Sequence, residues 1–400
     1  MNITFFSYYY FPRASASTWS TFVLSKQLAK KNKLKLLVPN IKYKIALNEE
    51  DSKEIEKNNQ SIVIKTPKIK IPQDLAPFIT PFFLFYLGLK EVKSSDVILC
   101  QFQPHHFTFI VGILLSKIYN IPIVARANDI HREMGVETYS FFQRLNIFRR
   151  SMFNTLNEAF VKYADTFLVV CVENKRILES RVGKLHNVEL NFNGVNESEF
   201  LNIDKSGSLR HLQLQDSDKI ILFVGRFSGP EYKIEVLMNA MKKVQNILPE
   251  CILLLVGDKL PDNIKQRNLS QNLRVRVVGH VPRSEIKHYL SVADLCIGPL
   301  GRTNAIPLKI LEYMICGKPV ITGFKSVSQD VAIDGYNCLV IPPEPDLLAD
   351  TIVEVLLNNE YAEYLGKNAR ETALRFTWDS IAEELEIILL KTLRKRIAKK

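Results

Sequence analysis

The 400-residue sequence contains few cysteines, and their spacing argues against two classes of protein. Its six cysteines lie far apart, mostly inside apolar runs, and no two form a C-x-x-C pair. Disulfide scaffolds and structural zinc sites both rely on closely spaced cysteines. We therefore expect reduced, buried thiols in a cytoplasmic protein, with no disulfide and no metal site.

The sequence also lacks a long apolar run. Its longest apolar stretch, residues 75–89, has 15 residues and contains Pro77 and Pro81. A membrane-spanning helix needs about 20 apolar residues. Residues 3–10 lack the basic region of a secretory signal and are expected to form a first strand instead. Both observations favour a cytoplasmic location.

Common ligand-binding motifs are missing as well. No Gly-x-Gly-x-x-Gly follows an expected strand, which argues against a dinucleotide-dependent oxidoreductase. No recognition motif for nucleic acid accompanies the formal net charge of +11, so no nucleic-acid partner is predicted. We interpret no Asp-x-Asp pair as a divalent-metal site, and we predict no cofactor.

What is present predicts an α/β protein of two domains. Four hundred residues exceed one ordinary core, and strand-like runs alternate with helical ones from end to end. A polar stretch, 198–218, separates two such series and is expected to be a linker, so we predict domains over 1–197 and 198–377. A final helix over about 378–400 has the amphipathic spacing to pack back onto the first domain. The expected architecture is two doubly wound, Rossmann-like sheets facing each other across a cleft, with ligands at the carboxyl ends of the strands.

The segment from Asn304 to Thr322 is the most informative part of the chain. It predicts a loop, a helix from about Pro307 to Cys316, a glycine stop and a buried strand over 319–322. The start of such a helix offers backbone N–H groups and a positive dipole end, which suits a phosphate. Glu312, about two turns in, could reach the hydroxyls of an attached sugar. An ordinary helix–strand unit of a parallel sheet explains the same pattern.

Two cations follow another expected strand. Leu222-Phe-Val-Gly225-Arg226 ends that strand at the expected cleft edge, and Lys233 lies near the start of the next helix. Such cations would hold a diphosphate and stabilise a leaving nucleotide phosphate. A surface salt bridge with Glu231 or Glu235 is the alternative.

In this order, the motifs resemble a known family. The series Val-Gly-Arg…Lys, Leu-Leu-Val-Gly-Asp, Val-Val-Gly-His-Val-Pro, Pro-Leu-Lys-Ile-Leu-Glu-Tyr-Met and Gly-Lys-Pro-Val is similar to the donor half of retaining nucleotide-sugar glycosyltransferases of family four, the glycosyl transferases group 1. The resemblance is continuous over 160–380 and weaker over 1–160. It implies the GT-B fold and transfer of a sugar from a nucleotide-diphosphate donor, without a metal.

Carried over to this sequence, the resemblance implies a donor site. Arg226 and Lys233 would hold the diphosphate in place of a metal, Glu312 would bind the ribose, and the backbone around Leu308 and Lys309 would hold a phosphate. The remaining donor positions implied are Gly225, Gly279, His280 and Val281, the last three flanking the base.

The sequence departs from the family at two donor positions. Asn304 stands where a second glutamate normally touches the donor sugar, and asparagine can still hydrogen-bond a hydroxyl. Ser15 and Ala16 replace a glycine pair whose N–H groups approach the donor phosphate. Both positions are kept as donor-site predictions.

On the acceptor side, some family members carry a histidine at the end of the strand that matches 121–126. This sequence has Asn128 and Asp129 there, with His131 just downstream. We predict Asp129 as a site residue that positions the acceptor or stabilises charge, beside Asn128 and His131. The predicted catalytic set is therefore Asp129, Arg226, Lys233 and Glu312.

The resemblance implies a retaining hexosyl-type transferase that uses a glycan or polyprenyl-linked acceptor in surface polysaccharide or glycoconjugate synthesis. Two alternatives stay open: a sugar-phosphate-type synthase with a soluble acceptor, and a nucleotide-sugar-binding protein without transfer activity.

The charge distribution bears on the acceptor. Residues 1–195 carry 26 basic and 16 acidic side chains, and the last ten residues add six basic ones and no acid. With the aromatic segments 75–89 and 139–153, this pattern favours peripheral contact with an anionic leaflet at the cytoplasmic face of the membrane. A well-solvated surface with aromatics in the core is the alternative.

Overall fold

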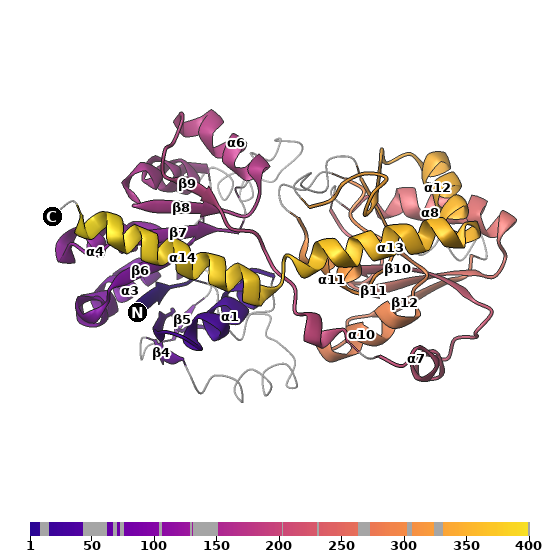
Figure 1. Cartoon of the computed structure of the whole chain (residues 1–400), viewed down its shortest axis with the longest axis horizontal. Helices are drawn as coiled ribbons and strands as arrows, with labels where there is room; N and C mark the ends of the chain where they lie inside the picture. The colour runs from indigo at the N-terminus through magenta and orange to yellow at the C-terminus, as the bar shows by residue number, and fades with distance from the viewer. Residues whose placement is uncertain are drawn as a thin grey trace. The chain divides into compact units, whose positions relative to one another are not determined.

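The protein forms two compact units in a computed structural model. Unit 1 comprises Met1–Asn193 with Trp378–Lys400, and unit 2 comprises Gly194–Thr377 (Figure 1). The residues that the structure describes are 1–8, 16–42, 62–66, 70–72, 76–103, 106–128, 130, 151–201, 203–229, 232–262, 273–301, 306–323 and 331–398. Each unit is described by itself below.

Unit 1 is built on a seven-stranded parallel sheet. The strand order is β4-β2-β1-β6-β7-β8-β9. Its strands are β1 (Asn2–Phe6), β2 (Lys33–Leu37), β4 (Val63–Lys65), β6 (Val97–Phe102), β7 (Ile123–Ala127), β8 (Thr166–Val169) and β9 (Val188–Leu190). Every residue of β6, β7 and β8 is buried, as expected of strands covered on both faces. Two short strands, β3 (Ile41–Lys42) and β5 (Ile71–Pro72), form a separate pair.

The helices of unit 1 come from both ends of the chain. They are α1 (Ala16–Ala29), α3 (Ala76–Glu91), α4 (Thr108–Tyr119), α6 (Val172–Val182), α14 (Trp378–Ile397), a helix over 151–159 and two 3₁₀ turns, η1 (Val92–Ser94) and η2 (Val161–Tyr163). The C-terminal helix α14 packs beside α1 and reaches β7 (Figure 1). The hydroxyls of Thr392 on α14 and Thr166 on β8 lie 2.8 Å apart in the buried interface. Segments more than 200 residues apart therefore share one core.

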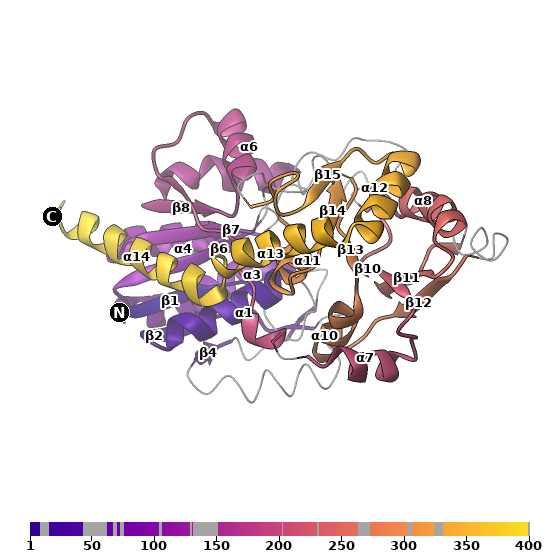
Figure 2. The ribbon, with the colours of Figure 1, turned by 45° about the vertical axis from the view of Figure 1, so that its right-hand side comes forward.

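Unit 2 has a six-stranded parallel sheet with the order β12-β11-β10-β13-β14-β15. Its strands are β10 (Lys219–Gly225), β11 (Cys251–Gly257), β12 (Val275–Gly279), β13 (Leu295–Ile297), β14 (Val320–Gly323) and β15 (Leu339–Ile341). Its helices are α7 (Lys205–Leu212), α8 (Ile234–Ile247), α10 (Arg283–Val292), α11 (Leu308–Ile315), α12 (Pro345–Leu357), α13 (Asn359–Leu374) and the 3₁₀ turn η3 (Glu197–Glu199). Helices α8 and α12 lie side by side, and α11 packs on α13 (Figure 2). The expected α/β class with two parallel sheets is confirmed.

The stretch expected as a linker contains ordered structure instead. Residues 198–218 lie within unit 2 and include α7. The carboxylate of Asp204 caps this helix by accepting hydrogen bonds from the N–H groups of Ser206 and Gly207, at 3.0 and 2.9 Å. A polar helix of this kind gives no apolar run, which explains why the sequence pattern indicated a linker.

The chain crosses between the units after Asn193 and again after Thr377. The two crossings run beside each other within unit 2. The N–H of Val195 donates to the carbonyl of Phe376 at 2.9 Å, and Val195 and Thr377 form a parallel bridge. Both crossing segments are therefore anchored at one place in unit 2.

Backbone segments approach each other closely where β10 and β11 end. A Cβ added at Gly257, whose φ is +139°, would lie 2.0 Å from the carbonyl oxygen of Gly225. At Gly335, φ is +69° and an added Cβ would meet no heavy atom within 4 Å.

We expect Gly257→Ala to cost about 3 kcal/mol or more in stability and Gly335→Ala only about 1 kcal/mol, because the second substitution strains φ without a clash. Chemical denaturation of the two variants checks this; equal losses would contradict it.

Candidate functional site

The candidate site lies at the carboxyl edge of the unit 2 sheet, where the strand order reverses. Strand β10 lies between β11 and β13, so successive connections leave to opposite sides at this point. Ligands of doubly wound sheets bind at such a switch point. Helix α8 follows β10, and α11 follows the loop after β13, so both helices begin at this edge.

Helix α11 has the limits expected from the sequence. Pro307 is its N-cap, with φ −62° and ψ 135°, and Cys316 is its C-cap. Gly317 follows with φ +66°, the left-handed conformation that ends many helices. No side chain caps the first turn, where Leu308 and Lys309 lie. This helix start has the form of an anion site.

The side chain of Lys309 adds a cation that the sequence reasoning did not assign. Its Nζ lies 4.8 Å from the ring centroids of both Phe223 and Tyr232. A Cβ added at Gly225 would lie 2.3 Å from the same atom, so the ammonium lies against the end of β10. Aromatic faces stabilise a cation by electrostatic attraction, and here they hold it beside the start of α11.

Arg226 lies at the same edge. Asp258 contacts it and also contacts two other predicted residues, His280 and Gly225. The Nε of Arg226 is 3.8 Å from one Asp258 oxygen, and the Nε2 of His280 is 3.8 Å from the other. Asp258 follows β11, and its N–H donates to the carbonyl of Gly225 at 3.1 Å. The side chains of Arg226 and His280 are 65% and 84% exposed, so a ligand can approach both. Sequence reasoning assigned no role to Asp258, although it directly follows the glycine that ends a predicted strand.

Lys233 is the N-cap residue of α8, the other helix that begins at this edge. It has φ 49° and ψ 42°, a left-handed conformation, and directly precedes α8. Within the described part of the chain Lys233 forms no ion pair, and the predicted alternative partner Glu231 lies outside the described residues. Gly279, with φ +84°, ends β12 at the next position along the edge, and His280 and the half-buried Val281 follow it before α10.

Glu312 is an enclosed charged group of the candidate site. Its side chain is 10% exposed, and its Oε1 accepts a hydrogen bond from Arg283 at 2.9 Å. The same guanidinium contacts Glu199 at 2.9 Å. Burial alone would lower the pKa of Arg283, but the two carboxylates outweigh it and raise the pKa above its usual value. Sequence reasoning did not find Arg283, because its partner lies 29 residues further along the chain.

The neighbouring Tyr313 fixes α11 to the central strand. Its hydroxyl accepts a hydrogen bond from the N–H of Val224 at 2.9 Å. The side chain is fully buried, and burial raises its pKa well above the usual value. This contact fixes the position of α11, and therefore of Glu312, relative to the end of β10.

The predicted acceptor residues are described only in part. Asn128 follows β7 and accepts a hydrogen bond from Arg126. Arg126 is buried and donates to Asn191 and to the carbonyl of Phe192, both at 2.8 Å. Burial lowers the pKa of Arg126 to about 9, with Glu384 opposing the shift, so the guanidinium stays charged at neutral pH. A charged residue inside an apolar strand was the signal that the sequence reasoning overlooked.

Several predicted site residues cannot be placed. Ser15, Asp129, His131 and Asn304 lie outside the described residues, as does the side chain of Ala16, the first residue of α1.

Unit 1 has its own polar cluster at the switch point between β1 and β6. Tyr8 and His106 stack there, with ring centroids 3.4 Å apart and an interplanar angle of 10°. The hydroxyl of Ser7 donates to the side-chain oxygen of Gln101 on β6. The sequence reasoning assigned no role to these four residues, which are all buried.

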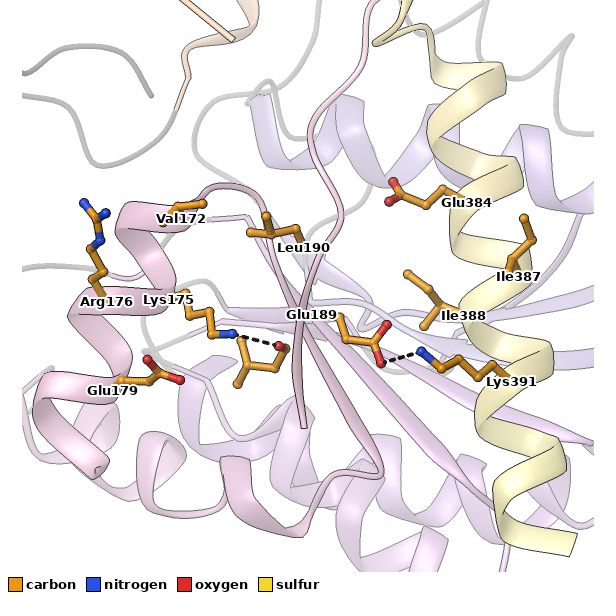
Figure 3. Close-up of a pocket in the computed structure, with 11 residues that line it drawn as sticks. Val172, Lys175, Arg176, Glu179, Glu189, Leu190, Glu384, Ile387, Ile388 and Lys391 are labelled. Atoms are coloured by element: carbon orange, nitrogen blue, oxygen red, sulfur yellow. Dashed lines mark hydrogen bonds and ion pairs between the residues drawn. The ribbon is translucent and has the colours of Figure 1, made fainter. Parts of the chain in front are cut away.

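A groove of about 770 Å³ lies elsewhere in unit 1 and contains none of the predicted residues. It is formed by α6, β9 and α14 (Figure 3). Lys175 donates to the carbonyl of Val188 at 3.4 Å, and Lys391 pairs with Glu189 at 3.3 Å. The basic and acidic side chains of the lining are equal in number (Lys175, Arg176 and Lys391 against Glu179, Glu189 and Glu384), so the groove does not gather charge of one sign.

No group of His, Cys, Asp and Glu side chains in the described ranges could hold a metal ion. No helix among the described residues has the length and apolar character needed to cross a bilayer.

Comparison with known proteins shows what the chain is similar to. Residues 205–372 match the family described as glycosyl transferases group 1. An uncharacterized glycosyltransferase of Methanocaldococcus jannaschii is 26% identical over 313 residues, covering 74% of this chain and 76% of the relative. Phosphatidyl-myo-inositol mannosyltransferase of Mycobacterium tuberculosis is 26% identical over 172 residues, covering 42% of this chain and 46% of the relative.

Solved structures share the fold over the whole chain. Anabaena HepE, determined in complex with UDP and glucose, has a TM-score of 0.73 at 17% identity and covers 97% of this chain and 99% of its own. Sucrose-phosphate synthase of Thermosynechococcus elongatus has a TM-score of 0.75 at 21% identity and covers 100% of both chains. The chain therefore has the GT-B fold, and the match of residues 205–372 to the glycosyl transferases group 1 agrees with the resemblance found in the sequence.

The contact between Tyr313 and Val224 generates a prediction about stability. In Tyr313→Phe the partly buried N–H of Val224 would lose its partner, which costs about 1–3 kcal/mol. Tyr364→Phe is the matched control, because Tyr364 is 48% exposed. We expect only the first variant to unfold at a clearly lower denaturant concentration. A Tyr313→Phe protein as stable as the control would contradict the contact.

Proposed function

We propose that this protein is a retaining glycosyltransferase that moves a hexose from a nucleotide-diphosphate donor to a glycan or lipid-linked acceptor. The pathway proposed is surface polysaccharide or glycoconjugate synthesis. The observation that carries the proposal is the carboxyl edge of the unit 2 sheet, where Arg226, Lys309 and the start of α11 surround the end of β10 and the enclosed Glu312 lies on the same helix.

The arrangement suits the parts of a nucleotide-sugar donor. The diphosphate would bind Arg226, Lys233 and the N–H groups at the start of α11, with Lys309 adding positive charge. Glu312 would accept hydrogen bonds from the ribose hydroxyls, and the segment from Gly279 to Val281 would flank the base. The UDP bound by the structural relative HepE supports a donor of this class.

The proposed chemistry relies on positioning and on charge. The acceptor hydroxyl would attack from the side that the diphosphate leaves, and the departing diphosphate would take its proton. Arg226 and Lys233 would stabilise the negative charge that develops on the leaving phosphate, an electrostatic effect that is often the largest contribution to catalysis. No enzyme nucleophile and no divalent metal is part of this proposal.

The acceptor would bind to unit 1 beside Asn128, Asp129 and His131. Arg126 orients Asn128, because the same guanidinium holds this side chain and the carbonyl of Phe192 in the segment after β9. A soluble sugar-phosphate acceptor would use the same residues, and an acceptor screen distinguishes it from a lipid-linked one.

The donor site is tested with two substitutions. We expect thermal stabilisation of the wild-type protein by UDP-, GDP- or ADP-sugars, since a ligand that favours the native state raises its melting temperature. Arg226→Ala and Glu312→Ala should each weaken binding of the selected donor by about 10- to 100-fold, because each removes a charged hydrogen-bonding partner.

Arg176→Ala is the control, since Arg176 is 74% exposed and lies on α6 of unit 1. Transfer or donor hydrolysis that survives in Arg226→Ala and Glu312→Ala would refute the assignment. Donor binding without any turnover by the wild type would favour the alternative of a nucleotide-sugar-binding protein.

A peripheral membrane contact extends the proposal, and α3 supplies the surface. Phe78, Phe82 and Tyr86 follow one another at intervals of four residues and are 48, 78 and 57% exposed. Residues spaced by four share a helix face. The Nζ of Lys90 lies 4.5 Å from the Tyr86 ring, so a cation ends this aromatic stripe. Aromatics beside cations suit the interface of an anionic leaflet.

Sedimentation with vesicles tests this contact. We expect the wild type to sediment with vesicles that contain anionic lipid and not with neutral ones, and the double variant Phe82→Ser with Tyr86→Ser to lose most of this binding. Leu357→Ser is the control, because Leu357 is 64% exposed on α12 of unit 2. Equal binding to neutral and anionic vesicles, or equal loss in the control, would contradict the contact.

A further inference from the structure

The carboxylate assigned to the ribose is held by an arginine that no motif singles out. Arg283, the first residue of α10, donates to Oε1 of Glu312 at 2.9 Å. We propose that Arg283 is a positioning residue that fixes the Glu312 carboxylate for the ribose hydroxyls and so makes the donor site select ribonucleotides over deoxyribonucleotides. This inference rests on the proposed donor site.

The pair leaves Glu312 ready to accept hydrogen bonds. Oε1 is occupied by the guanidinium, whereas Oε2 has no hydrogen-bond partner among the residues that the structure describes. A carboxylate with one oxygen fixed has fewer orientations to lose when a ligand binds, which lowers the entropic cost of binding. The pair is also shielded from water, since the side chains of Arg283 and Glu312 are 27% and 10% exposed.

Arg283 is itself held from the other side. Its Nε and terminal nitrogen lie 3.0 and 2.9 Å from one oxygen of Glu199 on η3. The other Glu199 oxygen accepts from Asn196 at 2.5 Å. One guanidinium therefore joins two carboxylates: its terminal nitrogen Nη2 contacts both, and its Nε adds a second contact to Glu199. A lysine could not reproduce this, because its ammonium lacks the planar, forked geometry.

A purely structural role for Arg283 is the competing explanation, and the chain contains a matched control. Arg370 also joins η3 to α11, since it pairs with Glu197 at 2.9 Å and donates to the carbonyl of Ile315 at 2.7 Å. It contacts the opposite end of α11 from the start that carries the proposed phosphate site, and not Glu312. If Arg283 only fastened η3 to α11, loss of Arg370 should have the same effect.

The experiment measures the preference for ribose by isothermal titration calorimetry. UDP, GDP and ADP are screened with the wild type, and the tightest binder is compared with its 2′,3′-dideoxy counterpart. We expect the wild type to bind the ribonucleotide at least about tenfold more tightly, the range for hydrogen bonds to a charged group. Arg283→Met keeps the apolar stem and should reduce this ratio to about 1–3, whereas Arg370→Met should keep it. Arg283→Lys should give an intermediate ratio.

The outcomes distinguish failure of the positioning role from failure of the donor site. An unchanged ratio in Arg283→Met, or an equal reduction in Arg370→Met, would overturn the positioning role while leaving the donor site intact. Absence of nucleoside diphosphate binding by the wild type would overturn the donor site and this inference with it. If Arg283→Met does not fold, Glu199→Gln takes its place, because it loosens the guanidinium from its second carboxylate. A reduced ratio is then expected, and a wild-type ratio would refute the proposal.

Discussion

The candidate site depends on the position of β10 at the point where the strand order of unit 2 reverses. Because β10 lies between β11 and β13, the loops after all three strands meet at one edge. This close contact requires glycine at the end of β11, because a Cβ at Gly257 would clash with the carbonyl of Gly225. The Tyr313–Val224 hydrogen bond then fixes α11 to the same strand. The arrangement of charges follows from this backbone constraint.

The charged groups at this edge fall into two kinds with different energetics. Arg226 pairs with Asp258 at 3.8 Å in an exposed setting, where an ion pair contributes at most about 1 kcal/mol, so a ligand can displace it at low cost. Glu312 and Arg283 form an enclosed pair, and loss of one partner there would leave an uncompensated charge. An exposed, loosely held cation suits a diphosphate that must bind and leave. An enclosed, rigid carboxylate suits recognition of a sugar that keeps its shape.

The sequence was sufficient to predict the features that depend on local pattern. Short apolar runs that end in glycine marked the strands of unit 2, and the Pro307–Gly317 signals marked α11. The polar helix α7 was missed, because its stability comes from the Asp204 cap and from packing on α10 rather than from an apolar stripe. Pairs that join distant residues were also missed. Nothing in the local sequence around Arg283 indicates that its partners are Glu199 and Glu312, since sheet topology alone brings them together.

The two arginine links give unit 2 a further property, which follows from where η3 lies. This turn comes directly after the first crossing segment, and that segment is hydrogen-bonded to the second one through Val195 and Phe376. Arg370 fastens η3 to the carbonyl of Ile315 at the end of α11, and Arg283 fastens it to Glu312 on the same helix. Because charge-assisted hydrogen bonds are short and directional, a shift of the crossing backbone cannot leave α11 unaffected unless one of these links breaks. The helix assigned to the donor and the backbone that joins the units therefore form one connected assembly within unit 2.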